Sequence, residues 1–208
     1  MGDITWAGDA YAGYVYSAAL HADGHAAVEY GGARAESLAA FAEVYRAMYP
    51  DHNLSDPAES ICDRTYLTGA PAYGRLYEVT FSNKIFLWKD GEAHLLNDRV
   101  NTSYFINGID EAVLTDLNGD GTEELVCVFN AGSGMYRHIA AAYDPVSRKG
   151  RELYSSLLEK DADELSLRLE NGLCQLYQGD TLLGTVTQNG LEPAAGFGLS
   201  NLLDLLGF

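Results

Sequence analysis

Residues 111–129 read EAVLTDLNGDGTEELVCVF, and this stretch decides both the expected fold class and the candidate site. Its flanks, Ala112–Thr115 and Leu125–Phe129, are apolar and carry β-branched residues, which favours strands. The residues between them, 116–123, are acidic and contain two glycines, a composition typical of a tight loop. The stretch therefore predicts two strands joined by a polar loop.

Segments on both sides of this hairpin also read as strands separated by turns. Lys89–Glu92 is the clearest turn because Asp90-Gly91 stands between two apolar runs, and Asn171-Gly172, Gly179-Asp180 and Asn189-Gly190 give similar signals. This turn spacing favours an antiparallel meander over alternating βαβ units. The expected strands cover residues 76–81, 84–88, 93–96, 103–106, 111–115, 124–129, 137–143, 151–154, 165–169, 173–177 and 182–187.

Helical patterns precede Gly74. Apolar residues recur at helical spacing from Ala35 to Tyr49, and Pro50 supplies the stop. A second, shorter helix is expected to start after Asp56 as N-cap, with Pro57 at its first position, and to end near Cys62.

The two ends of the chain carry weaker patterns. Asp23-Gly24 between residues 14–20 and 26–30 predicts a hairpin, with a short helix over 10–20 as the alternative. Residues 200–206 read as apolar helical turns that cap a core edge or occupy a partner groove. The expected fold class is α+β, mainly antiparallel β with an N-terminal helical portion. A boundary near Tyr73 divides residues 1–73 from a β-rich body, 74–208, and both parts can share one core.

Composition excludes several classes of protein. The chain has 208 residues with 13 Lys and Arg against 30 Asp and Glu, a net charge of −17, and 47% hydrophobic residues. That hydrophobic fraction supports a folded core, while the negative charge disfavours nucleic acid and anionic membrane surfaces as partners. No run of about 18 apolar residues occurs, so we expect no membrane span in this chain. Residues 1–6 lack the pattern of a leader, and whether a signal or lipoprotein leader was removed stays open.

Few residues suggest catalysis or zinc binding. The three cysteines, Cys62, Cys127 and Cys174, are odd in number and form no C-x-x-C pair, so we expect structural free thiols. The five histidines show no zinc-binding spacing, and Gly132-Ser133-Gly134 lacks the pattern of a nucleophile elbow. Acidic pairs such as Asp161 and Asp163 do not by themselves establish glycosidase geometry. We assign no catalytic residue.

The loop carries the one strong chemical signal. Oxygen-bearing side chains stand at Asp116, Asn118, Asp120 and Glu124, Thr122 can offer its backbone carbonyl, and Gly121 permits a sharp bend. Calcium takes six to eight hard oxygen ligands, and alternate positions around a tight loop supply them from one segment. An EF-hand is excluded because its twelfth position falls on Cys127 and its flanking helices are missing from the pattern.

Charge supports the same interpretation. No Lys or Arg occurs between Arg99 and Arg137, so the carboxylates of this segment are expected to repel one another unless a cation binds. The alternative is an Asn-Gly-Asp-Gly turn that is simply solvated. The acidic residues concerned are Asp110, Glu111, Asp116, Asp120, Glu123 and Glu124.

The loop resembles the D-x-[DN]-x-D-G-x-x-[DE]-L-[IV] repeats of the FG-GAP and VCBS families, through Asp116, Asn118, Asp120, Gly121 and Glu124-Leu125-Val126. The resemblance implies calcium bound between strands, but the single copy does not predict a propeller. Residues 132–140 are similar to the strand that follows this loop in uncharacterised secreted or lipoprotein-like proteins of gut Firmicutes.

These observations predict a calcium-stabilised binding or structural module rather than an enzyme. Sites of the extracellular class bind calcium with dissociation constants of roughly 10⁻⁴ to 10⁻³ M, too weakly for cytosolic calcium, so we expect an extracellular or cell-envelope location. A glycan or a cell-surface protein is the expected partner besides calcium. The alternative is a carbohydrate-binding protein or carbohydrate-active hydrolase with an acidic, tyrosine-lined groove, since the chain has 14 tyrosines.

Overall fold

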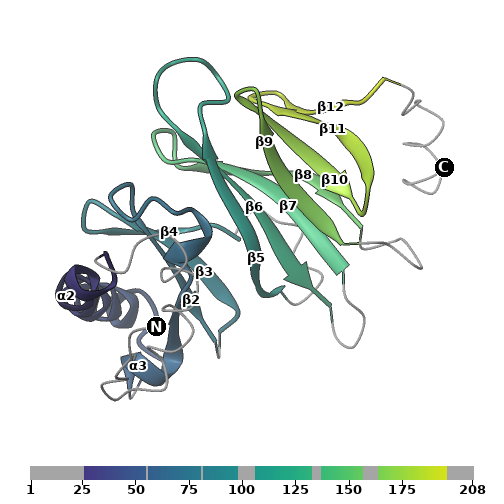
Figure 1. Ribbon diagram of the computed structural model, residues 1–208. Coiled ribbons are helices and arrows are strands. Elements are labelled where there is room, and N and C mark those ends of the chain that lie inside the picture. Colours follow the sequence, from purple (N-terminus) through teal and green to yellow (C-terminus); the bar gives the residue numbers. More distant parts are fainter. Residues whose placement is uncertain are drawn as a thin grey trace, which may run out of the picture. The chain divides into compact units, whose positions relative to one another are not determined.

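The computed structural model describes residues 26–54, 56–80, 82–97, 106–132, 137–156 and 164–195 (Figure 1). Helices stand near the N-terminal end of this part and antiparallel strands make up most of the rest, as expected for a β-rich α+β protein. Contacts divide the described residues into two compact units. One reaches Ser82 and includes Phe86–Ala93, and the other comprises Asn83–Ile85 and the residues from His94 onward. The boundary predicted near Tyr73 lies inside the first unit.

Helix α2 (Ala26–Met48) supplies the apolar face of the first unit. Phe41, Ala42 and Tyr45 are buried, at the spacing that the sequence predicts, whereas Met48 is exposed. The ring of Phe41 lies 4.7 Å from the ring of Tyr77, measured between centroids, and 5.4 Å from that of Phe86. These aromatic contacts hold the helix on the sheet of the first unit.

The start of α2 corrects one sequence prediction. Residues 26–30 were expected to form the second strand of a hairpin, but they form the first turns of the helix. Alanine favours helix over strand, and the helix continues through Gly31 and Gly32. The first expected strand, residues 14–20, lies outside the described residues.

The short helix α3 (Pro57–Ser60) begins as predicted. Asp56 is its N-cap and accepts a hydrogen bond from the Ala58 amide at 2.9 Å, with Pro57 at the first position. Its expected end near Cys62 is wrong, because strand β1 (Ile61–Asp63) starts directly after Ser60. This boundary is set by the pairing of β1 with β2, a later strand, which places Ile61 opposite Val79. Such pairing leaves no signal in the sequence around Ser60.

The first sheet has the strand order β1-β2-β3-β4. A 3-10 turn, η1 (Thr65–Leu67), lies between β1 and β2. The predicted turn at Lys89–Glu92 is confirmed, and both of its central residues, Asp90 and Gly91, have positive φ. The later strands of this sheet are β2 (Arg75–Val79), β3 (Lys84–Lys89) and β4 (Glu92–Leu95).

The second unit contains two four-stranded antiparallel sheets, each a simple meander (Figure 1). One face of each sheet contributes to a shared core, in which Val126, Val128 and Ala140 pack with Leu176 and Val186. This arrangement is a β-sandwich. The sheets consist of β5 (Ile106–Thr115), β6 (Glu124–Ala131), β7 (Arg137–Asp144) and β8 (Lys149–Ser155), and of β9 (Leu165–Glu170), β10 (Leu173–Gln178), β11 (Thr181–Thr187) and β12 (Gly190–Pro193).

Strand β6 is buried on both faces. Val126 and Val128 point into the core between the sheets, and Leu125, Cys127 and Phe129 on the opposite face are also at most 2% exposed. A strand buried on both faces has a continuous apolar sequence instead of an alternating one. This explains why residues 125–129 contain no polar side chain.

Most of the expected strands are present, with shifted ends. The segments expected over 103–106 and 111–115 differ, because β5 is one strand from Ile106 with register shifts after Ile106 and after Ile109. Residues 103–105 and the tail at 200–206 lie outside the described residues. Strand β12 was not predicted. Among the described residues, no helix has the length and apolar character needed to cross a membrane.

Two glycines in strands of the second unit give a matched test of this packing. A Cβ at Gly184 would overlap the carbonyl oxygen of Glu192 and lie 2.9 Å from its carbonyl carbon, whereas a Cβ at Gly150 would meet nothing closer than 3.7 Å. We expect Gly184→Ala to lower the free energy of unfolding by about 1–3 kcal/mol, because β12 must move away from β11. Gly150→Ala should change it by less than about 0.5 kcal/mol. Urea unfolding followed by circular dichroism measures both, and equal effects would contradict the close approach of β12.

Candidate metal site

The loop that carries the predicted calcium ligands joins two neighbouring antiparallel strands. Thr115 at the end of β5 pairs with Glu124 at the start of β6, and residues 116–123 form the connection. The strand–loop–strand arrangement is thus the one that the sequence predicts, and helices do not flank the loop as they would in an EF-hand.

Asp116 organises the first half of the loop. Its Oδ1 accepts hydrogen bonds from the amides of Gly119 at 2.6 Å and Asp120 at 3.2 Å, and its Oδ2 accepts one from Gly121 at 2.8 Å. Gly121 has φ +86°, a conformation that L side chains rarely adopt. The hydrogen bond from the Gly121 amide is the main cause that lowers the pKa of the exposed Asp116 carboxyl, because it favours the ionised form.

The second half of the loop closes through Asn118 and Glu124. Asn118 Nδ2 donates to Glu124 Oε1 at 2.8 Å and to Asp120 Oδ2 at 3.1 Å. Glu124, only 6% exposed, also accepts a hydrogen bond from the Leu117 amide at 2.7 Å. Thr122 takes part through its amide, which donates to Asp120 Oδ1 at 2.7 Å. The role predicted for the Thr122 carbonyl stays a prediction.

The donor set fits calcium by its chemistry, since three carboxylates and one carboxamide supply hard oxygens. These side-chain oxygens are arranged around the backbone amides of the loop, from which they accept hydrogen bonds. Within the described ranges, no group of three or more His, Cys, Asp and Glu side chains is placed to hold a metal ion. The Asn118 NH₂ group stands between the carboxylates of Asp120 and Glu124 and donates a hydrogen bond to each of them. A cation there would require Asn118 to present its oxygen instead.

The expectation that the acidic residues of this segment lack basic neighbours is wrong in part. His138 Nε2 lies 3.3 Å from Asp110 Oδ2, and Arg151 on β8 is close enough to Glu124 to interact electrostatically. Glu111 accepts a hydrogen bond from the amide of Leu167 at 2.6 Å. These partners come from other strands and cannot be found by scanning the segment for nearby Lys or Arg.

A cavity of about 360 Å³ lies beside the loop. Asn118 and Glu124 line it together with Asp144, Lys149 and Arg151, so that acidic and basic groups face the same space. Arg151 Nη2 donates to the carbonyl of Thr187, and its buried Nε has no hydrogen-bond partner in the part of the chain that the structure describes. Burial lowers the pKa of Arg151, an effect that Glu124 opposes.

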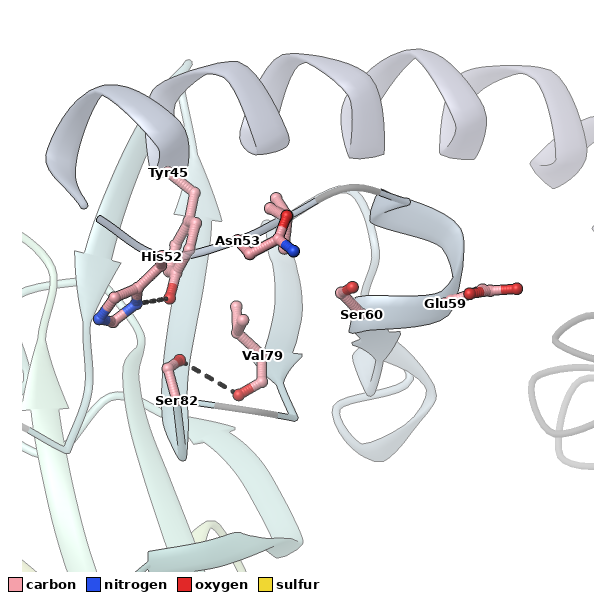
Figure 2. A pocket seen from close by; sticks show the side chains of 8 residues that line it. Tyr45, His52, Asn53, Glu59, Ser60, Val79 and Ser82 are labelled. Atoms are coloured by element: carbon pink, nitrogen blue, oxygen red, sulfur yellow. Dashed lines mark hydrogen bonds between the residues drawn. The ribbon is translucent and has the colours of Figure 1, made fainter. Parts of the chain in front are cut away.

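A larger cavity of about 500 Å³ lies in the first unit, away from every residue that the sequence analysis assigned to a site (Figure 2). Its lining includes Tyr45 on α2, His52 and Asn53 in the following connection, and Ser60 on α3. Tyr45 Oη and His52 Nδ1 are 2.7 Å apart. No sequence motif marks His52 as part of a site, because the residues around it come from three separate elements.

The cysteines are free thiols, as predicted. Burial raises the pKa of the Cys174 thiol to about 12 and that of Cys127 still further, so neither is reactive at neutral pH. Cys62 is partly buried, and burial followed by the charge of Glu78 raises its pKa as well. Ser133, Asp161 and Asp163 lie outside the described residues.

No protein-family model, curated protein or solved structure matches this chain.

The amide contacts of Asp116 predict a pH effect. Because its pKa is lowered in the folded protein, the loop is stabilised fully above the unfolded value of about 3.9 and loses this contribution as the pH falls through the folded value. We expect the ¹³C shift of the Asp116 carboxyl to titrate with a midpoint below about 3.9. The NMR titration is done in calcium-free buffer on protein from which the ion was removed beforehand at neutral pH, because a bound cation would lower the midpoint too. A midpoint at or above the unfolded value would contradict the amide contacts.

Proposed function

We propose that this protein is a binding or structural module that acts outside the cell or in the cell envelope and is stabilised by calcium bound to the loop of residues 116–124. The single observation that supports the proposal most is the convergence of Asn118, Asp120 and Glu124 on one another, with Asp116 holding the loop closed.

The burial of Glu124 gives the ion a structural role. Its carboxylate is nearly inaccessible, and it ties the start of β6 to the Leu117 amide and the Asn118 side chain. A cation held by Glu124 and Asp120 would join the two halves of the loop more strongly than the Asn118 NH₂ group does, because each carboxylate would face a full charge. Calcium would therefore lock the β5–β6 connection.

The proposed location follows from the expected affinity. The loop lacks a bidentate glutamate at the twelfth position, so its affinity is expected to resemble that of extracellular modules, with dissociation constants of roughly 10⁻⁴ to 10⁻³ M. Such a site fills at extracellular calcium concentrations and stays empty in the cytosol. The resemblance of the loop to FG-GAP and VCBS repeats favours the same ion and leaves the ligand of the module open.

Thermal unfolding with and without calcium tests the proposal. An ion that binds only the folded state at about 100 times its dissociation constant adds about 2.7 kcal/mol. For a chain of this size, each kcal/mol raises Tm by about 2–4 °C. We therefore expect Tm to be several degrees higher in about 10 mM calcium than in EDTA. The same Tm in both conditions would overturn the proposal.

Isosteric variants locate the effect. Asp120→Asn and Glu124→Gln each remove one charge from the loop, and both should abolish most of the calcium-dependent rise in Tm. Glu123→Gln is the matched control, because it removes a neighbouring charge at a position outside the proposed ligand set. Only the difference in Tm between calcium and EDTA is compared, since Glu124 also stabilises the fold without an ion. If all three variants keep the wild-type difference, calcium binds elsewhere.

A further inference from the structure

The cavity beside the candidate metal site has the size of a small-molecule site and lies within the second unit. Its volume of about 360 Å³ falls in the range of roughly 300–1,000 Å³ that such sites occupy. Asn118 and Glu124 line it from the loop, and Gln188, between β11 and β12, lines it from the second sheet. The β7–β8 hairpin, in which Asp144 pairs with Lys149, supplies another part of the wall. Strand pairing therefore holds these groups around one space.

Arg151 on β8 is the wall residue with an unused hydrogen-bond donor. Its Nη2 donates to the carbonyl of Thr187, but its buried Nε has no hydrogen-bond partner among the described residues. A guanidinium stays charged at neutral pH, and its planar fork of N–H donors matches the two oxygens of a carboxylate. A buried charged donor without an acceptor costs free energy. Arg151 therefore favours a ligand that brings oxygen atoms into the cavity.

The proposed calcium site also calls for an oxygen from outside the loop. Calcium takes six to eight oxygen ligands, whereas the loop offers five residues as ligands. Water or a bound molecule must therefore complete the shell of the ion. Asn118 and Glu124 belong to the predicted ligands and also line the cavity, so an oxygen in the cavity is placed to approach the ion. The five residues are Asp116, Asn118, Asp120, Thr122 and Glu124.

The charges around the cavity determine when an anion can bind. Without an ion, the three carboxylate ligands of the loop and the carboxylate of Asp144 outnumber the positive charges of Lys149 and Arg151 by two. This excess repels an anion. A calcium ion cancels it, so that an anion is attracted by the ion and by Arg151 without a net opposing charge. A second negative charge on the ligand would face Glu124 and Asp144, so a monoanion fits better than a dianion.

We propose that this cavity binds a small molecule through one carboxylate group, and that it binds this group more tightly when calcium occupies the loop. The carboxylate completes the shell of the ion and accepts hydrogen bonds from Arg151. This inference rests on the proposed calcium site, which it extends by naming the chemistry of the ligand. By linkage, the carboxylate raises the affinity for calcium by the same factor.

A titration of the whole chain, followed by ¹H–¹⁵N NMR, tests the inference. Each probe is added to about 50 mM, enough to detect millimolar affinity, in calcium-free buffer and in about 10 mM calcium. Sodium chloride keeps the ionic strength constant, and EDTA is left out because it is itself a carboxylate. The carboxylates are acetate, D-glucuronate and N-acetyl-L-alanine, of which the last two represent a sugar acid and the carboxyl end of a peptide. Acetamide is the uncharged control with the shape of acetate.

We expect at least one carboxylate to shift the amides of residues 118, 124, 144, 149–151 and 188 saturably. Its dissociation constant should be at least about fivefold lower in calcium than in calcium-free buffer, and acetamide should not bind. Equal affinity in the two buffers, binding of acetamide, or no binding of any carboxylate would overturn the inference. If calcium raises Tm while no carboxylate binds, the inference fails alone. If calcium has no effect on Tm or on the spectra, the proposed function fails with it.

Arg151→Gln assigns the binding to this cavity. Loss of the guanidinium should weaken carboxylate binding in calcium by about tenfold, because a charge-assisted hydrogen bond is lost. The same variant should bind calcium severalfold more tightly when no carboxylate is present, because a positive charge near Glu124 is removed. A loss of folding would weaken both. Arg168→Gln on β9 is the matched control, since it removes an equal charge at an exposed position outside the cavity and should change neither affinity.

Arg151→Lys separates the charge of this residue from its shape. Lysine keeps the positive charge and lacks the planar fork, so calcium binding should stay at the wild-type level while carboxylate binding weakens. This variant also tests the inference if Arg151→Gln does not fold. Carboxylate binding that is unchanged in the folded Arg151 variants would place the ligand elsewhere and overturn the inference.

Discussion

The buried carboxylate of Glu124 is the constraint around which the candidate metal site is built. A carboxylate removed from water is stable only when its oxygens are hydrogen-bonded or face a positive charge. In this protein, the Leu117 amide and the Asn118 side chain supply the hydrogen bonds, and Arg151 on β8 supplies the charge. The strand pair, the loop and a third strand are therefore tied to one side chain.

Elements whose signals are local can be predicted from the sequence. Asp56 and Pro57 mark the start of α3, Pro50 marks the end of α2, and Asp90-Gly91 sets a hairpin turn, because each acts through its own backbone conformation or hydrogen bonds. Strands β1 and β12 escaped because they are short, three and four residues, and form only by pairing with β2 and β11. Residues 26–30 were predicted to form a strand because the two alanines of this segment, which favour a helix, also fit the apolar pattern of a strand.

The candidate sites also differ in whether their residues are close to one another in the sequence. The oxygen-bearing residues of the loop are close in sequence, so their spacing alone indicates a cation. Arg151, the basic residue near Glu124, lies 27 positions later in the sequence. The strand order β6-β7-β8 brings the two residues close together. The cavity of the first unit joins residues from Tyr45 to Ser82, none of which forms a motif. Nothing in the sequence shows that Ser60 is buried beside this cavity.

Strand β12 stands at one edge of its sheet in the order β12-β11-β10-β9 and ends at Pro193, which faces Gly184 on the neighbouring strand. An open edge is where a foreign chain can add by β-pairing, and a short strand that ends in a residue without an amide hydrogen offers it few donors. The glycine that admits β12 so closely thus has a second effect. By admitting this short strand next to β11, it fills a position at the edge of β11 that a longer and more regular strand from another molecule would otherwise take.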